Sequence, residues 1–542
     1  ADEMAMVKQM KHLISIFPLN LQSFGIQTNY ILNFKQYGPK YRWLVTVAGL
    51  TGAVAMILSA TIVNVAVPSI MGAYGIGQDV AQWAATAFLS MMVVSQLLNS
   101  WVVSAMGQRS AYTMTLCVFI LGTFVCTFSP NIDILIIGRM MQGFSAGIIQ
   151  PLVLAVMVAV FPKNKRGFAV GVYGLGVTMA PSFGPLVGGI TIDLLTWRHS
   201  FLMPLPLVAV ALVGGLIFMP SKKLERRLPP FDFWGFCLIC ISLVLIMRAI
   251  GNGHRWGWGS DLTLITGTAG VVAFLLFIRS QMKSKAPLLD PTLFLDPKFA
   301  AAMAIGFAFG AGNFATNYAI PVFVQTIQNF SPTESGLVLV PAGLFLCALI
   351  PLSGRLADSV PPHIPITAGC IIMATSTYLI SYSDVNTTFW MIAWLTVMSR
   401  LALGLVMPNL GGAAMRSIST EKLNAAAGAY NFVRQSGGAF GVNITASLIE
   451  YRSAQHADWL TTTQTSANSL TREFLQQVRD LLQAGGLKDI ALEWGAVDYL
   501  GQTIYAQART YGFQETFVIV SVAFIIAIIP SMLLARSSKK PS

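Results

Sequence analysis

Charged residues are scarce in this sequence. Only 10% of its 542 residues are charged, whereas 55% are hydrophobic and the mean hydropathy is +0.66. Because soluble domains carry about 25% charged residues, this composition excludes a soluble globular protein. Apolar runs of roughly 20 residues, enough to cross a bilayer core, recur along the whole length. Lipid offers no partner for free backbone polar groups, and the runs do not alternate, so they predict membrane-spanning helices and not a β-barrel.

Catalytic and metal-binding groups are also scarce. The five histidines are scattered among loops and a tail, and none forms a metal pair (His12, His199, His254, His363, His456). The sequence contains no P-loop and no Ser/His/Asp grouping. All six cysteines fall inside apolar runs, and the close pair Cys237 and Cys240 has no basic neighbour to activate a thiol. The sequence therefore predicts neither an enzyme nor ATP-driven transport, and it predicts no metal and no cofactor.

The apolar runs number fourteen. They lie near 43–66, 80–101, 111–130, 134–160, 168–192, 200–219, 232–250, 262–279, 300–323, 336–357, 363–382, 388–410, 424–450 and 514–535. Charged, proline-containing linkers at 221–232 and 279–299 flank the seventh and eighth runs. The polar loop 451–513 contains "SLTREFLQQVRDLLQAGG" (469–486), whose helical spacing and Gly-Gly end predict a small extracytoplasmic helix. That helix is either a docking element or a connector.

The basic residues predict the orientation. With both termini in the cytoplasm, 23 of the 34 Lys and Arg residues fall in the tails and cytoplasmic loops. Seven fall outside, five of them in the loop 451–513, and four lie within spans. Short external loops then hold only Arg198 and Arg255, as the positive-inside rule requires. We therefore expect a multi-pass protein of the cytoplasmic (inner) cell membrane, and this bias, not nucleic-acid binding, explains the pI near 9.5.

An internal repeat divides the chain into two halves. "GRMMQGFSAGIIQP" (138–151) has an echo in "SRLALGLVMP" (399–408), which aligns Arg139 with Arg400, and "SWVVSAMGQR" (100–109) is a degraded form of "GRLADS" (354–359). Two parallel six-helix halves with two helices inserted between them account for fourteen spans. The predicted parts are a tail with a candidate amphipathic helix (1–42), an N-terminal bundle (43–220), the insert with its linkers (221–299), a C-terminal bundle (300–535) that includes the loop 451–513, and a cytoplasmic tail (536–542).

The segment "GVYGLGVTMAPSFGPLVGG" (171–189) carries a helix face without side chains. Gly184, Gly188 and Gly189 leave bare backbone on that face, so a neighbouring helix can approach closely. Pro185 removes one helix hydrogen bond and favours a bend. Such a helix suits the interface between two halves, although plain small-residue packing is the alternative.

These motifs together resemble a known family. The glycine-rich segment resembles the antiporter motif on the fifth helix of major facilitator exporters, and "GRMMQGFSAG" resembles the motif on their fourth helix. "TWRHSFLMPLP" (196–206), "APLLDPTLFLDPKF" and "NFVRQSGGAFG" (431–441) are similar to segments of the fourteen-helix drug:H+ antiporter family, the EmrB/QacA type. The resemblance spans about 43–535. It implies an all-α major facilitator fold that works by alternating access, with proton influx driving efflux, as in multidrug resistance antiporters.

Two departures from the family pattern concern acidic residues. The opening "LSATIVNVAVP" (58–68) has Ser59 where the family usually has Asp. The loop after the second span keeps Gly107 and Arg109 but has Ser104 at the usual Asp, whereas the second copy keeps Gly354, Arg355 and Asp358. The resemblance implies that this Asp belongs to a gating charge network, so the first copy lacks part of it.

No acidic residue lies at mid-span, but arginines do. A charge at the bilayer centre costs at least about 2.5–3.5 kcal/mol, so Arg139 and Arg434 are expected to face a cavity or polar partners, and so is Arg400. The alternative is that these arginines bond carbonyls and hold helices together, whereas Arg248 lies near a helix end and can snorkel. Other candidate cavity residues are Asn64, Gln142, Asn317, Gln325, Asn431, Gln435, Tyr173 and Tyr318.

A cavity that holds arginines without a carboxylate has a positive potential and favours anions. We therefore expect a secondary transporter that exports anionic or amphiphilic small molecules such as a siderophore, a fatty acid or an acidic drug. The alternative is a broad multidrug:H+ antiporter whose coupling acid is Asp193 or Glu450 at the outer ends of two spans. Pattern alone does not separate export from import, and a transporter-like receptor is a further alternative. The resemblance also implies a periplasmic adaptor and an outer-membrane channel as candidate partners.

Overall fold

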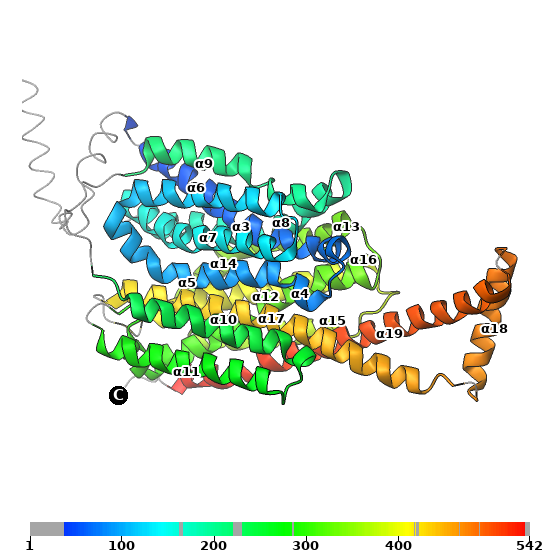
Figure 1. The fold of residues 1–542 in the computed structure, drawn as a ribbon. Helices are drawn as coiled ribbons and strands as arrows, with labels where there is room; N and C mark the ends of the chain where they lie inside the picture. The colour runs from blue at the N-terminus through cyan, green and yellow to red at the C-terminus, as the bar shows by residue number, and fades with distance from the viewer. Residues whose placement is uncertain are drawn as a thin grey trace, which may run out of the picture.

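The fold was analysed in a computed structural model, which describes residues 37–38, 40–161, 166–220, 230–284, 287–416, 418, 422–465, 467–486 and 488–536. Within these residues the secondary structure is entirely helical, as predicted (Figure 1). Thirteen helical segments of this described part are long and apolar enough to cross a membrane. The predicted run 424–450 falls outside that set because it is rich in polar residues and glycine, yet it lies in a continuous helix of 40 residues that packs inside the bundle. The fourteen-helix fold is therefore confirmed.

The first half contains the helices up to residue 218. They are α3 (Lys40–Tyr74), α4 (Gln78–Ala81), α5 (Trp83–Met106), α6 (Gln108–Thr127), α7 (Ile132–Val160), α8 (Arg166–Leu194), the 3-10 helix η3 (Trp197–Phe201) and α9 (Leu205–Phe218). The chain reverses between α5 and α6 at Gly107, whose φ of 79° is open to glycine at little cost. Asn131 begins α7, because its side chain accepts a hydrogen bond from the backbone N–H of Ile134.

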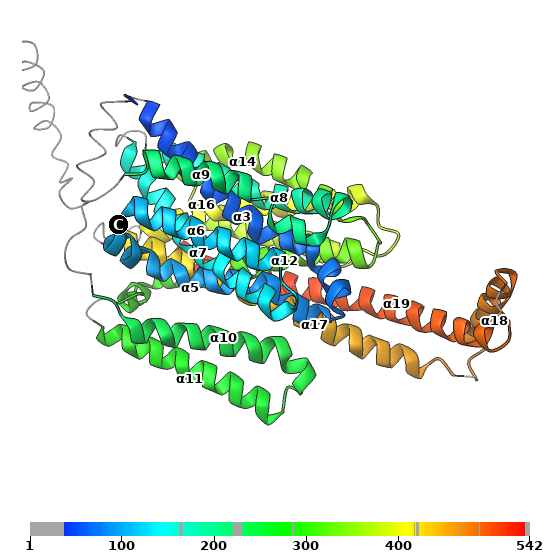
Figure 2. The ribbon, with the colours of Figure 1, turned by 45° about the horizontal axis from the view of Figure 1, so that its top comes forward.

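The insert forms a separate helical hairpin beside the bundle. It consists of α10 (Phe233–Trp256) and α11 (Asp261–Lys283), which Figure 2 shows as a layer of their own. Asp232 caps α10 and Ser260 caps α11. α10 packs on α17 and α5, whereas α11 contacts mainly α10 and leaves large apolar side chains such as Ile265 and Leu275 exposed. Those side chains are suited to face lipid.

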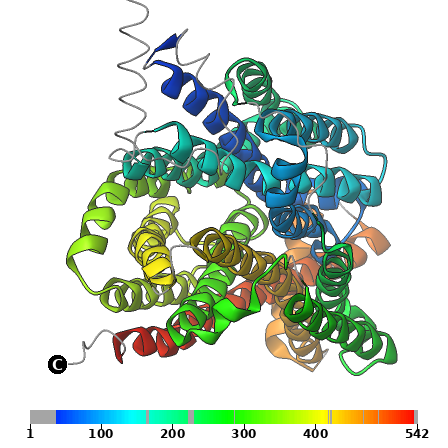
Figure 3. The same ribbon diagram turned by 90° about the vertical axis from the view of Figure 1, so that its left-hand side faces the viewer.

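The second half repeats the helical pattern of the first. It comprises η4 (Pro291–Leu295), α12 (Pro297–Thr326), α13 (Pro332–Leu337), α14 (Val340–Ser359), α15 (His363–Ile380), α16 (Phe389–Arg416), α17 (Leu423–Thr462), α18 (Ser469–Ala484), α19 (Asp489–Ile526) and α20 (Ile528–Arg536). Figure 3 shows the blue-to-teal helices of the first half and the yellow-green-to-red helices of the second half as two groups, with the green insert at one side.

A stalk, defined here as the described residues of 451–513, projects from one end of the bundle. α17 and α19 continue beyond the bundle, and α18 crosses their tip (Figures 1 and 2). The predicted helix over 469–486 is confirmed, since α18 spans Ser469–Ala484. An ion pair of 2.9 Å between Arg479 and Glu493 and a ring contact between Phe474 and Tyr499 hold α18 on α19. We call this end of the molecule the stalk end.

The described chain begins and ends at the end of the bundle opposite the stalk, on opposite sides of it (Figures 1 and 3). α3 begins there at Lys40, three residues before the predicted start of the first span, and α20 ends there at Arg536 (Figure 1). The candidate amphipathic helix in the tail 1–42 lies almost wholly outside the described residues.

An ion pair joins the linker after the insert to the loop before α17. Lys422 Nζ lies 3.0 Å from Asp290 Oδ2. Partial burial by itself raises the pKa of the Asp290 carboxyl, but hydrogen bonds from Thr292 and Lys422 outweigh it and hold that pKa below its ordinary value of 3.8.

Candidate substrate and gating site

Arg139 lies fully buried inside the first half. From α7, its Nε donates to the Ala84 carbonyl at 2.7 Å, and its Nη1 donates to the Ser59 carbonyl at 3.1 Å and to Gln142 Oε1 at 2.7 Å. The Ser59 hydroxyl accepts a further bond at 3.2 Å, and the guanidinium lies 4.4 Å from the centre of the Phe88 ring. Ser59 thus supplies two neutral oxygens at the place where the family usually has a carboxylate. The contacts match the alternative in which this arginine holds helices together.

Arg400 occupies the matching place in the second half. From α16, its Nη1 donates to Asn313 Oδ1 at 3.1 Å and its Nη2 donates to Asn317 Oδ1, both on α12. Each half therefore directs an arginine from its fourth helix toward neutral oxygens on its first helix, as the internal repeat predicts. None of the three mid-span arginines, Arg434 included, forms an ion pair with a carboxylate in the part of the chain that the structure describes.

A third polar group lies where the two halves meet. It consists of Gln150 on α7, Tyr173 on α8, and Asn431, Arg434 and Gln435 on α17. Gln435 and Gln150 face each other across the halves at 3.5 Å, and the Tyr173 hydroxyl donates to the Gln150 carbonyl at 3.0 Å. We call these five residues the central polar cluster.

Arg434 is the charged member of the central polar cluster. It is half-buried, and its Nη2 reaches only Asn431 Oδ1, at 3.4 Å. Its Nε is buried and has no hydrogen-bond partner among the described residues. Tyr173 and Tyr430 lie within electrostatic reach of its charge. The guanidinium therefore has donors to spare at the interface between the halves.

Sequence reasoning missed Gln150 in this cluster. Gln150 is the next-to-last residue of the motif that contains Arg139, seven residues after Gly143 and three after Gly147. Residues at such spacings share one helix face, so the position could have been found from the motif. The four other members of the cluster were among the predicted cavity residues.

The remaining predicted cavity residues lie elsewhere. Asn64 on α3 donates to the Asn317 carbonyl at 3.3 Å and so joins the halves next to Arg400. Gln142 belongs to the Arg139 group and also donates to the Thr123 hydroxyl. Gln325 bonds to the Ser335 hydroxyl at the stalk end, and Tyr318 is fully buried near Gln78.

The glycine-rich face of α8 makes close contacts with both halves. A methyl group at Gly184 would overlap Thr61 of α3, and one at Gly189 would overlap the Pro332 carbonyl at the start of α13. Gly188 packs on Ile62, and the backbone at Pro185 lies against Gly336 of α13. The two halves are thus packed tightly through α8 and α13 at the stalk end.

The two loop motifs differ in what the structure describes. Arg109 Nε donates to the Met219 carbonyl at 2.9 Å, so it binds the C-terminal end of α9, where a cation is favourable. α14 runs through Gly354, Arg355 and Asp358, but their side chains lie outside the described residues. Arg248 is exposed on α10, but the helix continues for eight residues beyond it to Trp256, so it does not lie near the helix end as predicted; its guanidinium lies 5.6 Å from the Trp256 ring centre.

Asp193 and Glu450, the candidate coupling acids, both contact the opposite half at the stalk end. Asp193 Oδ2 accepts from the backbone N–H of Thr333 at 2.9 Å, and Glu450 Oε1 accepts from the backbone N–H of Gln78 at 3.0 Å. Opening this end by separating the halves would break both contacts.

Two helical bundles that meet along a polar interface define a membrane transporter. The chain belongs to the Major Facilitator Superfamily, whose family model matches residues 49–442. It is 26% identical over 512 residues to the Fatty acid resistance protein FarB of Neisseria gonorrhoeae, covering 92% of this chain and 97% of FarB. It is 25% identical over 488 residues to the Multidrug export protein EmrB of Haemophilus influenzae, covering 89% and 93%. The EmrB/QacA-type resemblance seen in the motifs is confirmed.

Solved structures support the same fold. A bacterial homologue of the human lysosomal transporter Spinster, in an inward-facing and unoccupied conformation, aligns with a TM-score of 0.61 at 14% identity. The alignment covers 92% of this chain and 98% of that structure. At this identity the likeness concerns the fold alone.

Proposed function

We propose that this transporter exports anionic or amphiphilic small molecules by alternating access, driven by proton influx. The observation that carries the proposal is Arg434, a half-buried cation at the interface between the halves that is paired with no described carboxylate. A positive site in a low-dielectric interface attracts anions and repels cations. The neutral amides and the Tyr173 hydroxyl around it are suited to orient a carboxylate.

The names of the relatives support this class of substrate. FarB is named for fatty acid resistance and EmrB for multidrug export. A fatty acid is an amphiphile with one carboxylate, which fits an arginine beside apolar and aromatic side chains. Siderophores with carboxylates and acidic drugs share that chemistry. The superfamily is one of transporters and not of enzymes, so no reaction is proposed.

The test is flux in proteoliposomes with a pH gradient. Carboxyfluorescein serves as the anionic probe and ethidium as the cationic one, and Arg434→Gln is compared with Arg248→Gln, an exposed arginine outside the central polar cluster. We expect anion flux to fall at least about tenfold in Arg434→Gln, the loss of one charge-assisted contact, and to persist in Arg248→Gln. Ethidium export that is robust in Arg434→Gln, without any anion flux in the parent protein, would overturn the proposal.

A second candidate function is a broad multidrug:H+ antiporter with its coupling acid at Glu450 or Asp193. Its support is that both carboxylates bond to the opposite half at the stalk end, where protonation would weaken the contact. Ethidium flux that depends on the pH gradient and is lost in Glu450→Gln or Asp193→Asn favours this alternative.

We also propose that the stalk end is extracytoplasmic and that both termini are cytoplasmic in the inner membrane. The distribution of basic residues supports this orientation, because the short loops at the stalk end hold few of them. The stalk would then reach into the periplasm in a host with two membranes. Its exposed apolar side chains, such as Leu470, Leu481 and Trp494, suit docking of a periplasmic adaptor that leads to an outer-membrane channel.

A further inference from the structure

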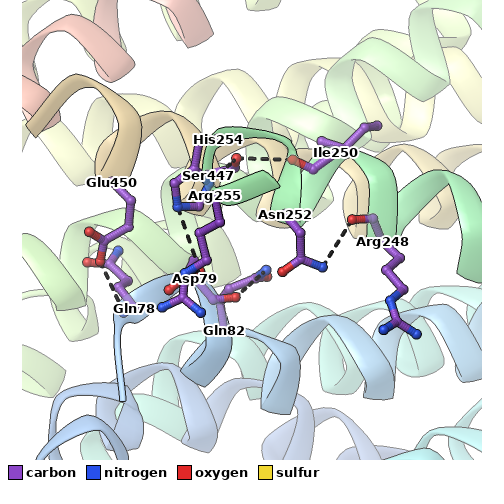
Figure 4. A network of polar contacts seen from close by, with 10 residues as sticks. All are labelled: Gln78, Asp79, Gln82, Arg248, Ile250, Asn252, His254, Arg255, Ser447 and Glu450. Carbon is purple, nitrogen blue, oxygen red and sulfur yellow. Dashed lines mark hydrogen bonds and ion pairs between the residues drawn. The ribbon is translucent and has the colours of Figure 1, made fainter. Parts of the chain in front are cut away.

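The one-turn helix α4 joins α3 to α5 at the stalk end and is held by three other elements, of which Figure 4 shows the contacts with α17 and α10. The backbone N–H of Gln78 donates to Glu450 of α17 at 3.0 Å, and the Gln78 side-chain oxygen accepts from Arg509 of α19 at 2.8 Å. The third element is the insert, since Arg255 Nε at the tip of α10 lies 2.6 Å from Asp79 Oδ2. α4 is therefore bound by the second half and by the insert at the same time.

Asp79 is a buried carboxylate, with only 2% of its side chain exposed. A buried carboxylate is costly unless it is paired, and within the described structure its cationic partner is Arg255, while His254 Nε2 lies 3.7 Å away. Both partners come from α10. Gly77 lies close beneath the pair, because a methyl group there would come within 3.3 Å of Arg255 Nη2. The insert thus supplies, through Arg255, the charge that makes burial of Asp79 tolerable.

α10 is also attached to the second half. The Ser447 hydroxyl of α17 donates to the Ile250 carbonyl of α10 at 3.1 Å and lies 3.5 Å from His254 Nδ1. Gly251 of α10 packs on Asn443 of α17. α10 therefore lies against α17 of the second half while its tip binds α4 of the first half, so it bridges the two halves at the stalk end.

We infer that the tip of α10 is a strap that keeps the stalk end closed, with Arg255 and Asp79 as its positioning residues. The inference rests on alternating access as proposed above, but it does not depend on the identity of the substrate. When the halves separate at the stalk end, α4 moves away from α17, and the Arg255–Asp79 pair must break or carry α10 with it. The two inserted helices, α10 and α11, would thereby set the equilibrium between the closed and open conformations of the stalk end.

The test measures the opening of the stalk end directly. Spin labels are placed in a cysteine-free background at Leu194 of the first half and at Val385 of the second half, both exposed at the stalk end. Distances between the labels are recorded for the parent protein, Arg255→Gln and Asp79→Asn. Loss of this close ion pair to a buried carboxylate predicts that the ratio of open to closed forms rises roughly tenfold in both variants.

Two controls separate the strap from general loosening. Arg255→Lys keeps the charge and is expected to restore most of the closed population. Arg452→Gln removes an arginine that pairs with Glu515 at 3.3 Å within the second half, and it should leave the distances unchanged. Transport should show altered turnover with an unchanged KM in Arg255→Gln, because the pair does not touch the central polar cluster.

The outcomes decide between the proposals. Unchanged distances in Arg255→Gln, where the arginine is nearly half exposed and folding is not at risk, would overturn the strap. An equal shift in Arg452→Gln would overturn it as well. If the anion proposal fails in liposomes while Arg255→Gln still opens the stalk end, the strap stands and only the substrate class is wrong.

Discussion

Replacing Arg139 by lysine tests whether this arginine holds helices or faces a substrate. The substitution keeps the positive charge, so it isolates the geometry of the guanidinium. The Arg139 Nε and Nη1 atoms donate in two directions, to Ala84 on one side and to Ser59 and Gln142 on the other. A single lysine ammonium group can donate to the acceptors on one side only, so the hydrogen bonds on the other side are lost. We therefore expect the Ala84 carbonyl to lose its donor.

The expected cost follows from these contacts. One lost hydrogen bond from a charged donor costs about 1.5–3 kcal/mol. The weaker contact with the Phe88 ring adds about 0.5–1 kcal/mol. Arg139→Lys should therefore destabilise the protein by about 2–4 kcal/mol. Thermal unfolding of the purified protein in detergent measures this loss as a lower melting temperature.

Arg434→Lys is the matched control. Its guanidinium makes a single side-chain hydrogen bond at 3.4 Å, so little stability depends on its shape. We expect its melting temperature to stay close to that of the parent protein, with any change appearing in the KM for an anionic probe. The reasoning is refuted if Arg139→Lys melts like the parent protein and instead raises the KM, because Arg139 would then be the residue that faces the substrate.

Three further substitutions probe separate features. Gly143→Ala should destabilise the contact between α5 and α7 by about 1–3 kcal/mol in thermal unfolding, because its methyl group would overlap the Phe88 carbonyl. Ser59→Asp places a carboxylate beside the buried arginine of α7 and should give anion flux a steeper dependence on pH; an unchanged profile would contradict this. Asp290→Asn should lower stability at pH 7 by up to about 1 kcal/mol, since its partner Lys422 is half exposed. Because the folded pKa of this carboxyl lies below 3.8, the stability that it contributes is present above that pH and disappears as the pH falls through the folded value, where the two proteins should melt alike.

The helices were predictable because each feature that defines them is local. Apolar runs located the spans, and the charged linkers located the insert. The polar helix α17 is the instructive case: 424–450 was predicted as a span, but its hydropathy is too low for the helix to count among the thirteen apolar spans, and it contains the motif "NFVRQSGGAFG". Its glycines explain the motif, since methyl groups at Gly437 and Gly441 would overlap backbone atoms of α12. A helix that packs this closely is shielded from lipid and can be polar.

The candidate site was only partly predictable, because a list of side chains omits backbone partners. The sequence shows that Arg139 has no mid-span acid to bind, but it does not show the Ala84 and Ser59 carbonyls that accept its hydrogen bonds. Arg255 was placed in a short external loop, and neither it nor Asp79 belongs to a motif that joins α4 to the insert. Their ion pair depends on how α10 lies on α17, which is a property of tertiary packing.

The missing acid at Ser59 changes the charge of the first half more than its shape. A carboxylate there would neutralise Arg139, whereas the hydroxyl and the carbonyl of Ser59 accept hydrogen bonds from its Nη1 and leave its charge in place. Arg400 is likewise bound by amide oxygens, so both halves keep a net positive interior. A cationic cargo that passes between them would have to overcome this potential, while an anion would be drawn to it. Each of the three arginines has one buried nitrogen without a described hydrogen-bond partner, but Arg434 is the least buried of the three and lies beside Gln150 and Gln435, where the halves meet. The preference of the transporter for anionic over cationic substrates should therefore depend on Arg434, and the stability of the protein on Arg139.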